Sequence, residues 1–185
     1  MKQDQTPRYG SETRKTLAVL GALCFFLSAI EYMIPKPLPF MRIGVANLPL
    51  TLGVDILPFP AFLALAGLKI IGQALISGTL FSYIFLFSCA GTILSALSMY
   101  AARRVLGKDR VSFVGINTLG AGVSNLSQLV LARVFVFGAA VRYMAPPFLA
   151  AGLAAGVALG FFCEAFARRS RWYEKHKKRR SDEQV

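Results

Sequence analysis

Most charged residues in this 185-residue chain are concentrated in three short clusters, which are separated by long runs with few charges. The clusters are MKQDQTPRYGSETRK at the N-terminus, RRVLGKDR at residues 103–110 and RRSRWYEKHKKRR at residues 168–180. The chain is 55% hydrophobic and only 16% charged, against about 45–50% and about 25% in soluble domains. A soluble domain of this size could not bury so much apolar surface, so the pattern predicts an integral membrane protein.

Six apolar runs are separated by turns, proline-rich breaks or charged loops. Three prolines in PKPLPF and two in PFP cannot lie inside a helix, because proline lacks the amide donor and clashes with the preceding turn. We therefore predict an all-α membrane bundle of six transmembrane helices over residues 16–167, with an N-terminal tail (1–15) and a basic C-terminal tail (168–185). The expected spans cover about residues 16–34, 42–57, 61–78, 81–102, 111–137 and 144–167.

The distribution of lysine and arginine predicts the orientation. An even number of spans puts both tails on one side, and that side also holds the basic loop at residues 103–110. The positive-inside rule then places both termini in the cytoplasm of a multi-pass protein of the cell (inner) membrane. A net charge of +12 can also indicate nucleic-acid binding. Here the basic residues flank apolar runs, so we expect contact with lipid headgroups and no nucleic-acid partner.

Nothing in the sequence predicts catalysis, a metal or a cofactor. Cys24, Cys89 and Cys163 are far apart, and the one histidine, His176, is in the basic tail. This spacing does not predict a zinc site. No ATP-binding loop of the G-x-x-x-x-G-K-[ST] type occurs, so the chain is not expected to power transport unaided. We therefore expect a binding protein and not an enzyme.

Polar residues inside the expected spans are the best indication of function, because such groups are costly in a membrane. Lys69 and Gln73 share one helix face, and Ser124 and Gln128 share another together with Asn117. Arg133 and Asn125 lie on the adjoining stripe. We predict a substrate site formed by Arg42, Asn47, Lys69, Gln73, Asn125 and Gln128.

The cations among these residues suggest the charge of the ligand. Arg42 and Lys69 have few acids expected at the same depth, so an anionic small molecule would compensate them. The alternative for Lys69 is a buried acid of the protein itself. Glu31 is expected in the outer headgroup region, pairing with Lys36 or Arg42, and Asp55 is expected to be solvated or to contact a basic partner.

Two stripes of small residues permit close helix contacts. Gly152, Gly156 and Gly160 are spaced by four in the last span, and internal packing is the favoured interpretation. Ala18 and Ala22 have the same spacing in the first span. For them, internal packing and docking of a partner subunit are both open.

The segments IEYMIPKPLPFMRIGVANLPLTL (30–52) and KIIGQALISGTLFSYIFLFSCAGTILSAL (69–97) resemble the Gx transporter family, often labelled heptaprenyl diphosphate synthase component I. The resemblance extends over about residues 16–167. That family is grouped with the substrate-binding S-components of energy-coupling factor (ECF) transporters. The resemblance implies six helices, cytoplasmic termini and an outward-facing pocket capped by the loop after the first helix. It also implies a transmembrane coupling subunit with two ATPases, docked through an A-x-x-x-A face that Ala18 and Ala22 match.

We therefore expect the substrate-binding subunit of an ECF-type importer that captures a small anionic, vitamin-like or isoprenoid-related compound. The alternative is an accessory membrane subunit of heptaprenyl diphosphate synthase in prenyl or menaquinone biosynthesis. Prenyl chain synthesis needs clustered aspartates to hold magnesium and diphosphate. No two of the four aspartates, Asp4, Asp55, Asp109 and Asp182, are close together in the sequence. The chain is therefore not expected to be the catalytic subunit itself.

Overall fold

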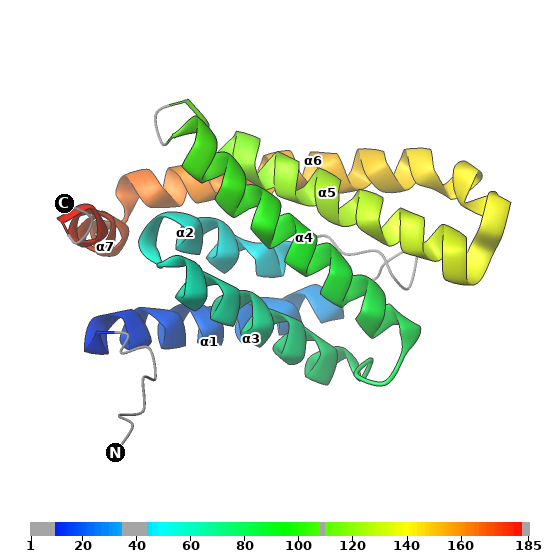
Figure 1. Ribbon diagram of the computed structural model, residues 1–185, viewed down its shortest axis with the longest axis horizontal. Helices are drawn as coiled ribbons and strands as arrows, with labels where there is room; N and C mark the ends of the chain where they lie inside the picture. The colour runs from blue at the N-terminus through cyan, green and yellow to red at the C-terminus, as the bar shows by residue number, and fades with distance from the viewer. Residues whose placement is uncertain (1–9, 35–43, 108–109, 183–185) are drawn as a thin grey trace, which may run out of the picture.

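The computed structural model describes residues 10–34, 44–107 and 110–182, and these residues form helices and no strand. The predicted all-α class is therefore confirmed (Figure 1). The elements are α1 (Ser11–Met33), the 3₁₀ turn η1 (Val45–Asn47), α2 (Leu48–Ile56), α3 (Phe59–Ser77), α4 (Tyr83–Leu106), α5 (Phe113–Ala132), the π-helical turn η2 (Arg133–Phe137), the 3₁₀ turn η3 (Gly138–Ala140), α6 (Val141–Arg169) and α7 (Arg171–Asp182).

Four helical stretches of the described chain are long and apolar enough to cross a membrane. Three of them are α1, α3 and α4. The fourth is the continuous helical stretch from Phe113 to Arg169, which contains α5, η2, η3 and α6. This last stretch reverses at η2 and η3, where Gly138 has a φ of 53°, so that α5 and α6 lie side by side and run in opposite directions (Figure 1). These apolar helices identify a multi-pass membrane protein.

The second predicted span, residues 42–57, does not form a full-length transmembrane helix. Helix α2 has nine residues, or about 14 Å at 1.5 Å per residue, which is half of a bilayer core of about 30 Å. Gly44 before it adopts a left-handed φ of 87°, Pro49 occupies the first turn, and Pro58 begins the next helix. The left-handed backbone at Gly44 and the proline at position 58 therefore limit the length of α2. The described residues do not confirm six full-length spans.

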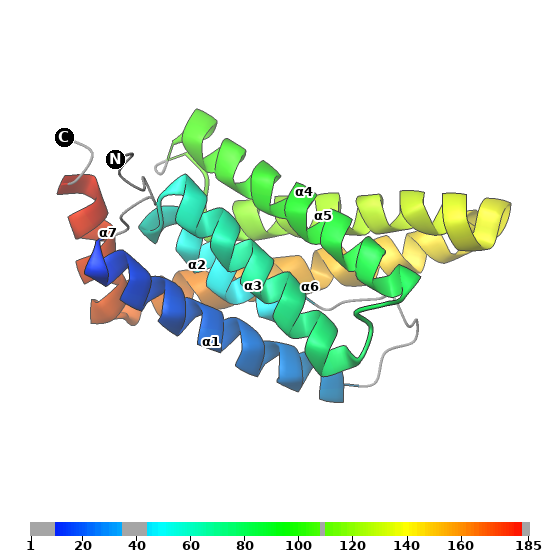
Figure 2. The same ribbon diagram turned by 60° about the horizontal axis from the view of Figure 1, so that its bottom comes forward.

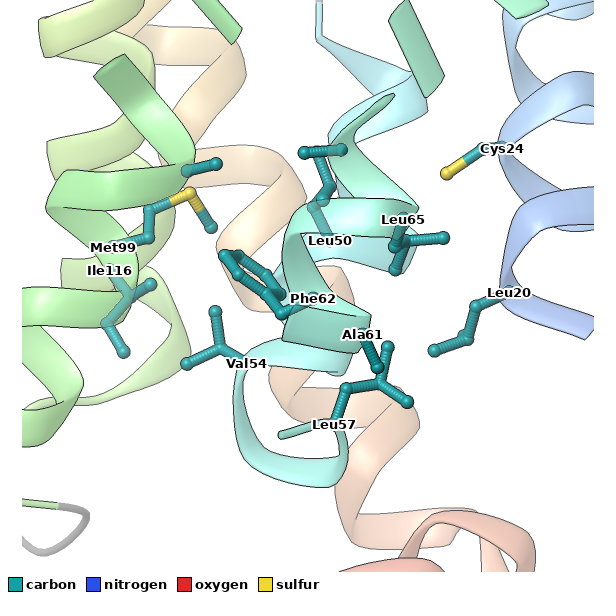
Figure 3. Close-up of a cluster of buried hydrophobic side chains, with 12 residues drawn as sticks. Leu20, Cys24, Leu50, Val54, Leu57, Ala61, Phe62, Leu65, Met99 and Ile116 are labelled. Atoms are coloured by element: carbon teal, nitrogen blue, oxygen red, sulfur yellow. The ribbon is translucent and has the colours of Figure 1, made fainter. Parts of the chain in front are cut away.

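Helix α2 is enclosed by the longer helices (Figures 1 and 2). All nine of its residues are buried. Leu50 and Val54 belong to one apolar cluster with Phe62 of α3 and Met99 of α4, and Figure 3 shows this cluster. Close packing against these side chains holds a helix that is too short to be stable alone.

The end of the bundle where α1 begins is closed by α7, and we call it the basal end (Figure 1). Here the carboxylate of Asp55, the last polar residue of α2, is fully buried. Arg103 of α4 donates to it from Nε (2.8 Å) and from Nη2 (2.7 Å), and the hydroxyl of Tyr173 of α7 donates to it at 2.8 Å. Arg103 also donates to the carbonyl of Val111. Of the two expectations for Asp55, solvation is wrong, and the basic partner that it contacts is Arg103 of the same chain.

Within the predicted C-terminal tail, residues 171–182 form helix α7. Tyr173 is buried against the ring of Phe113, with 5.9 Å between ring centroids. Trp172 stacks on His176 at 4.4 Å. Tyr173 belongs to an apolar cluster of the bundle and Trp172 packs against the same cluster, so two aromatic side chains attach this strongly basic helix to the bundle.

Tyr173 should make stability depend on pH in the alkaline range. Burial raises the pKa of its hydroxyl, and so do the charge of Asp55 and the hydrogen bond to it. Above the unfolded-state pKa of about 10 the unfolded chain loses this proton while the folded chain keeps it, so the free energy of unfolding falls by up to about 1.4 kcal/mol per pH unit. Tyr173→Phe should remove this part of the slope in denaturation series between pH 9 and pH 11. Equal slopes in the two proteins would contradict the buried position of the hydroxyl.

Candidate functional site

A polar pocket lies in the half of the bundle away from α7. Helices α1, α3, α4, α5 and α6 and the segment before α2 all contribute to its wall, and its cavity volume is about 20 Å³, room for about one water molecule. The lining residues are Glu31, Gly44, Asn47, Lys69, Gln73, Thr92, Ala121, Ser124, Asn125, Gln128 and Gly152.

Five of the six predicted site residues line this one pocket. The structure brings together residues that are up to 81 positions apart in the sequence, from Asn47 to Gln128. The sixth, Arg42, lies outside the described residues, as does Lys36. Sequence reasoning missed Glu31, Thr92 and Ser124 as pocket residues. Thr92 and Ser124 could not be recognised as pocket residues from the sequence, because serine and threonine are common in apolar helices.

The α3 wall of the pocket carries the buried cation. Lys69 is only 4% exposed, and its Nζ donates to Oγ1 of Thr92 on α4 at 2.9 Å. Gln73 follows one helical turn later, is 5% exposed, and has an Oε1 with no hydrogen-bond partner. A buried amide oxygen without a partner costs free energy, so it marks a place where a bound group would be stabilised.

The α5 wall carries two further buried amides. Gln128 is 2% exposed; its Nε2 donates to Oγ of Ser124 at 3.2 Å, and its Oε1 has no partner. Asn125 is 4% exposed, and its Nδ2 has no partner. Gly152 of α6 makes room for it, because a Cβ at that glycine would lie 1.6 Å from Asn125 Nδ2. The side chain of Asn125 can therefore occupy this position only because residue 152 is a glycine.

Glu31 supplies an acid to the same pocket, contrary to the prediction. Its carboxylate is buried and accepts hydrogen bonds from the amides of Gly44 and Ala46, each at 3.2 Å. Amides at the start of a helical segment carry positive partial charge and attract an anion. Glu31 is therefore buried inside the bundle. Among the residues that line the pocket with Lys69, Glu31 is the one acid.

Two other polar residues of the expected spans lie away from the pocket. Asn117 accepts a hydrogen bond from Thr51 (2.8 Å) and donates to the carbonyl of Gly156 (3.0 Å), so it joins α2, α5 and α6. Arg133 is exposed in the turn η2. Asn117 has a structural role, and Arg133 has no contact with the pocket lining.

The two small-residue stripes have different surroundings. A Cβ added to Gly156 would lie 2.8 Å from the Cβ of Ala121, and one added to Gly160 would lie 2.5 Å from the Cα of Val114. The glycine stripe therefore packs against α5, which confirms the internal interpretation. Ala18 and Ala22 are exposed on the outside of α1, so no helix of the described chain covers them.

No metal-binding group is found among the described residues: no three His, Cys, Asp or Glu side chains lie together. What the pocket offers is hydrogen bonding and charge. It combines one ammonium, one carboxylate, several amides and hydroxyls in an apolar bundle, where each interaction is strengthened by the low dielectric. Such a site is suited to binding a small polar molecule.

Comparison with known proteins identifies the family. A family model described as heptaprenyl diphosphate synthase component I matches residues 20–166. This range contains α2, α3, α4 and α5 complete and most of α1 and α6. Neither the curated proteins nor the solved structures gave a match. Because the matched range covers most of the chain and nearly all of the membrane bundle, the protein belongs to the heptaprenyl diphosphate synthase component I family.

Proposed function

We propose that the protein is the substrate-binding membrane subunit of an energy-coupling factor type importer. The observation that supports this most is the pocket itself, a polar hollow inside an apolar bundle with three buried amide atoms that lack partners. Unpartnered buried polar atoms are rare in folded proteins and suggest a site whose ligand is absent. A small molecule bearing phosphate or carboxylate would interact with Lys69 there.

The proposed orientation follows from charge and from the place of the pocket. With both termini in the cytoplasm of the cell membrane, the basal end faces inward and the pocket lies in the outer half of the bundle. A ligand captured from outside would then be released inward when the whole bundle tilts against a coupling subunit. The energy would come from two ATPase subunits bound to that coupling subunit.

Docking to the coupling subunit should use the outer face of α1. Ala18 and Ala22 are exposed there, with Val19 and Phe26 beside them. Small side chains let a partner helix approach closely, and leucine would hold it away. We expect Ala18→Leu combined with Ala22→Leu to reduce co-purification of ATPase subunits at least tenfold, measured by affinity purification from membranes of the source cells.

A control is Ala64→Leu, which makes one substitution of the same type at an exposed site on α3. It should leave the recovery of ATPase subunits unchanged. If wild-type protein recovers no ATPase subunits at all, the importer proposal fails. If both variants reduce recovery equally, α1 is not the docking face.

Lys69 should be needed for retention of a natural ligand with an anionic group. Lys69→Met keeps the length of the side chain and removes its charge, so the bound compound should fall at least tenfold in extracts of the purified protein, measured by mass spectrometry. Arg133→Met removes a cation from an exposed site outside the pocket and should leave the amount unchanged. Equal retention in the two variants would show that Lys69 does not contact the ligand.

A second candidate function is an accessory membrane subunit of heptaprenyl diphosphate synthase, which the description of the family favours. The chain would then anchor or supply a separate catalytic subunit. Asp55, the aspartate of α2, is occupied by Arg103 and Tyr173, so it is not available to bind magnesium diphosphate. Co-purification separates the candidates, because a soluble prenyl synthase partner would support the second and ATPases the first.

A further inference from the structure

The reversal between α5 and α6 forms a tip at the end of the bundle opposite to α7 (Figures 1 and 2). We call it the distal tip; it comprises residues 133–143, which are η2, η3 and the first residues of α6. Phe137 and Val141 attach it to an apolar cluster that also contains Phe87 of α4. One side of the tip is therefore packed against the bundle, and this packing fixes the orientation of the exposed side.

The distal tip reaches the boundary between the membrane and water. Helix α3 has 19 residues and is about 28 Å long at 1.5 Å per residue, close to a hydrocarbon core of about 30 Å. The turn after it, residues 78–82, interrupts the helix, and irregular backbone of this kind is not stable in contact with hydrocarbon. In both views the tip extends past this turn (Figures 1 and 2). The tip therefore lies among the lipid headgroups or beyond them.

The exposed side of the distal tip combines positive charge with apolar side chains. Val134, Phe135 and Tyr143 are 69%, 62% and 71% exposed. Arg133 and Arg142 are exposed in the same segment. Tyrosine and arginine together are typical of the membrane–water interface, where the ring lies at the level of the headgroups and the charge remains hydrated. This composition favours a position in the headgroup layer.

Neither arginine has a compensating acid in the part of the chain that the structure describes. No Asp or Glu occurs in residues 110–163, and neither Arg133 nor Arg142 forms one of the described ion pairs. The guanidinium of Arg142 lies 4.7 Å from the centroid of the Tyr143 ring, and its Nη2 donates to the tyrosine hydroxyl at 2.6 Å. A guanidinium has five N–H donors. Most of them remain available for phosphate oxygens, which arginine binds in bidentate geometry.

We propose that the distal tip binds the headgroups of anionic phospholipids, with Arg133 and Arg142 at the phosphates and Phe135 and Tyr143 inserted just below them. In the proposed orientation these are lipids of the outer leaflet. The bound headgroups hold the end of the α5–α6 hairpin at the membrane boundary. Neither arginine lines the polar pocket, so this site is separate from it and does not depend on the importer proposal.

The test uses the full-length protein in lipid nanodiscs with one fluorescent reporter at the tip. Trp172→Phe removes the one natural tryptophan and keeps an aromatic ring there, and Phe135→Trp introduces the reporter. A lipid with brominated acyl chains quenches a tryptophan that it touches. Quenching by brominated phosphatidylglycerol and by brominated phosphatidylcholine, at equal mole fraction, therefore measures which lipid collects at the tip. We expect an at least threefold preference for phosphatidylglycerol, which decreases in high salt because exposed charges are screened.

Two sets of variants assign this preference to the arginines. Arg133→Gln combined with Arg142→Gln should abolish it, whereas lysine at both positions keeps the charge and should retain most of it. Both positions are exposed, so circular dichroism should show the same helix content in all these proteins. The control reporter is Leu94→Trp in the Trp172→Phe protein, at a site that is 47% exposed in the middle of α4. There the two lipids should quench equally.

Three results would overturn the inference. A reporter at residue 135 that neither lipid quenches would show that the tip projects into water, where a partner protein would have to cover it. Equal quenching by the two lipids would show that the arginines do not select anionic headgroups. A preference that persists after both substitutions by glutamine would assign it to other groups. None of these decides the importer proposal, which depends separately on recovery of ATPase subunits.

Discussion

Asp55→Ala is expected to destabilise the protein by about 3–5 kcal/mol, the usual cost of removing one member of a buried ion pair. The carboxylate accepts two hydrogen bonds from Arg103 and one from Tyr173. Removing it leaves the Arg103 guanidinium with its charge uncompensated inside the protein. The free energy of unfolding in mixed detergent micelles, followed by circular dichroism, measures the effect.

The triple variant Asp55→Leu, Arg103→Met and Tyr173→Phe provides the control. It replaces both charges and the hydroxyl by apolar groups of similar size, so no charge is left without its partner, and such replacements are often neutral or stabilising. We expect it to recover most of the lost stability. A triple variant as unstable as Asp55→Ala would show that the network contributes more than charge compensation.

Gly160→Ala is expected to cost about 3 kcal/mol, at the upper end of the range for overpacking a core. The added Cβ would lie 2.5 Å from the Cα of Val114 and 3.2 Å from the carbonyl oxygen of Phe113. Both are backbone atoms and cannot rotate away, so α5 and α6 must separate at this point. The same denaturation assay measures the loss.

Gly67→Ala is the matched control for this substitution. Gly67 lies in the interior of α3, and a Cβ added there meets no atom within 4 Å. Alanine has the higher helix propensity, so this variant should be as stable as wild type or more stable by up to about 1 kcal/mol. Equal effects at Gly67 and Gly160 would contradict the close approach of α5 and α6.

Helix α2 joins the pocket to the basal end. The segment preceding it bonds to Glu31 through the amides of Gly44 and Ala46. Thr51 in its middle bonds to Asn117 of α5, and Asp55 near its end bonds to α4 and α7. Polar contacts therefore fix the short helix at both ends and at its centre, so that it lies in one position within an otherwise apolar core.

Local sequence pattern was sufficient for much of the fold. Long apolar runs predicted α1, α3, α4 and α6 to within a few residues, because a helix in a membrane is defined by its own length and hydropathy. Spacing by four also grouped Lys69 with Gln73, and Ser124 with Gln128, on faces that line one pocket. The same stripes included Asn117 and Arg133, which do not line it. These features depend only on residues within one or two turns of each other.

The sequence alone did not predict the contacts between distant residues. Asp55 and Arg103 are 48 positions apart, and Glu31 and Ala46 are 15 positions apart. The length of α2 was missed for the same reason, since an apolar run of this kind is compatible with a full span or with a short helix enclosed by others. The sequence by itself determined an all-α membrane protein with polar faces on its third and fifth apolar runs. Only the tertiary structure decided which charges meet, because pairing depends on how helices pack and not on the order of residues within them.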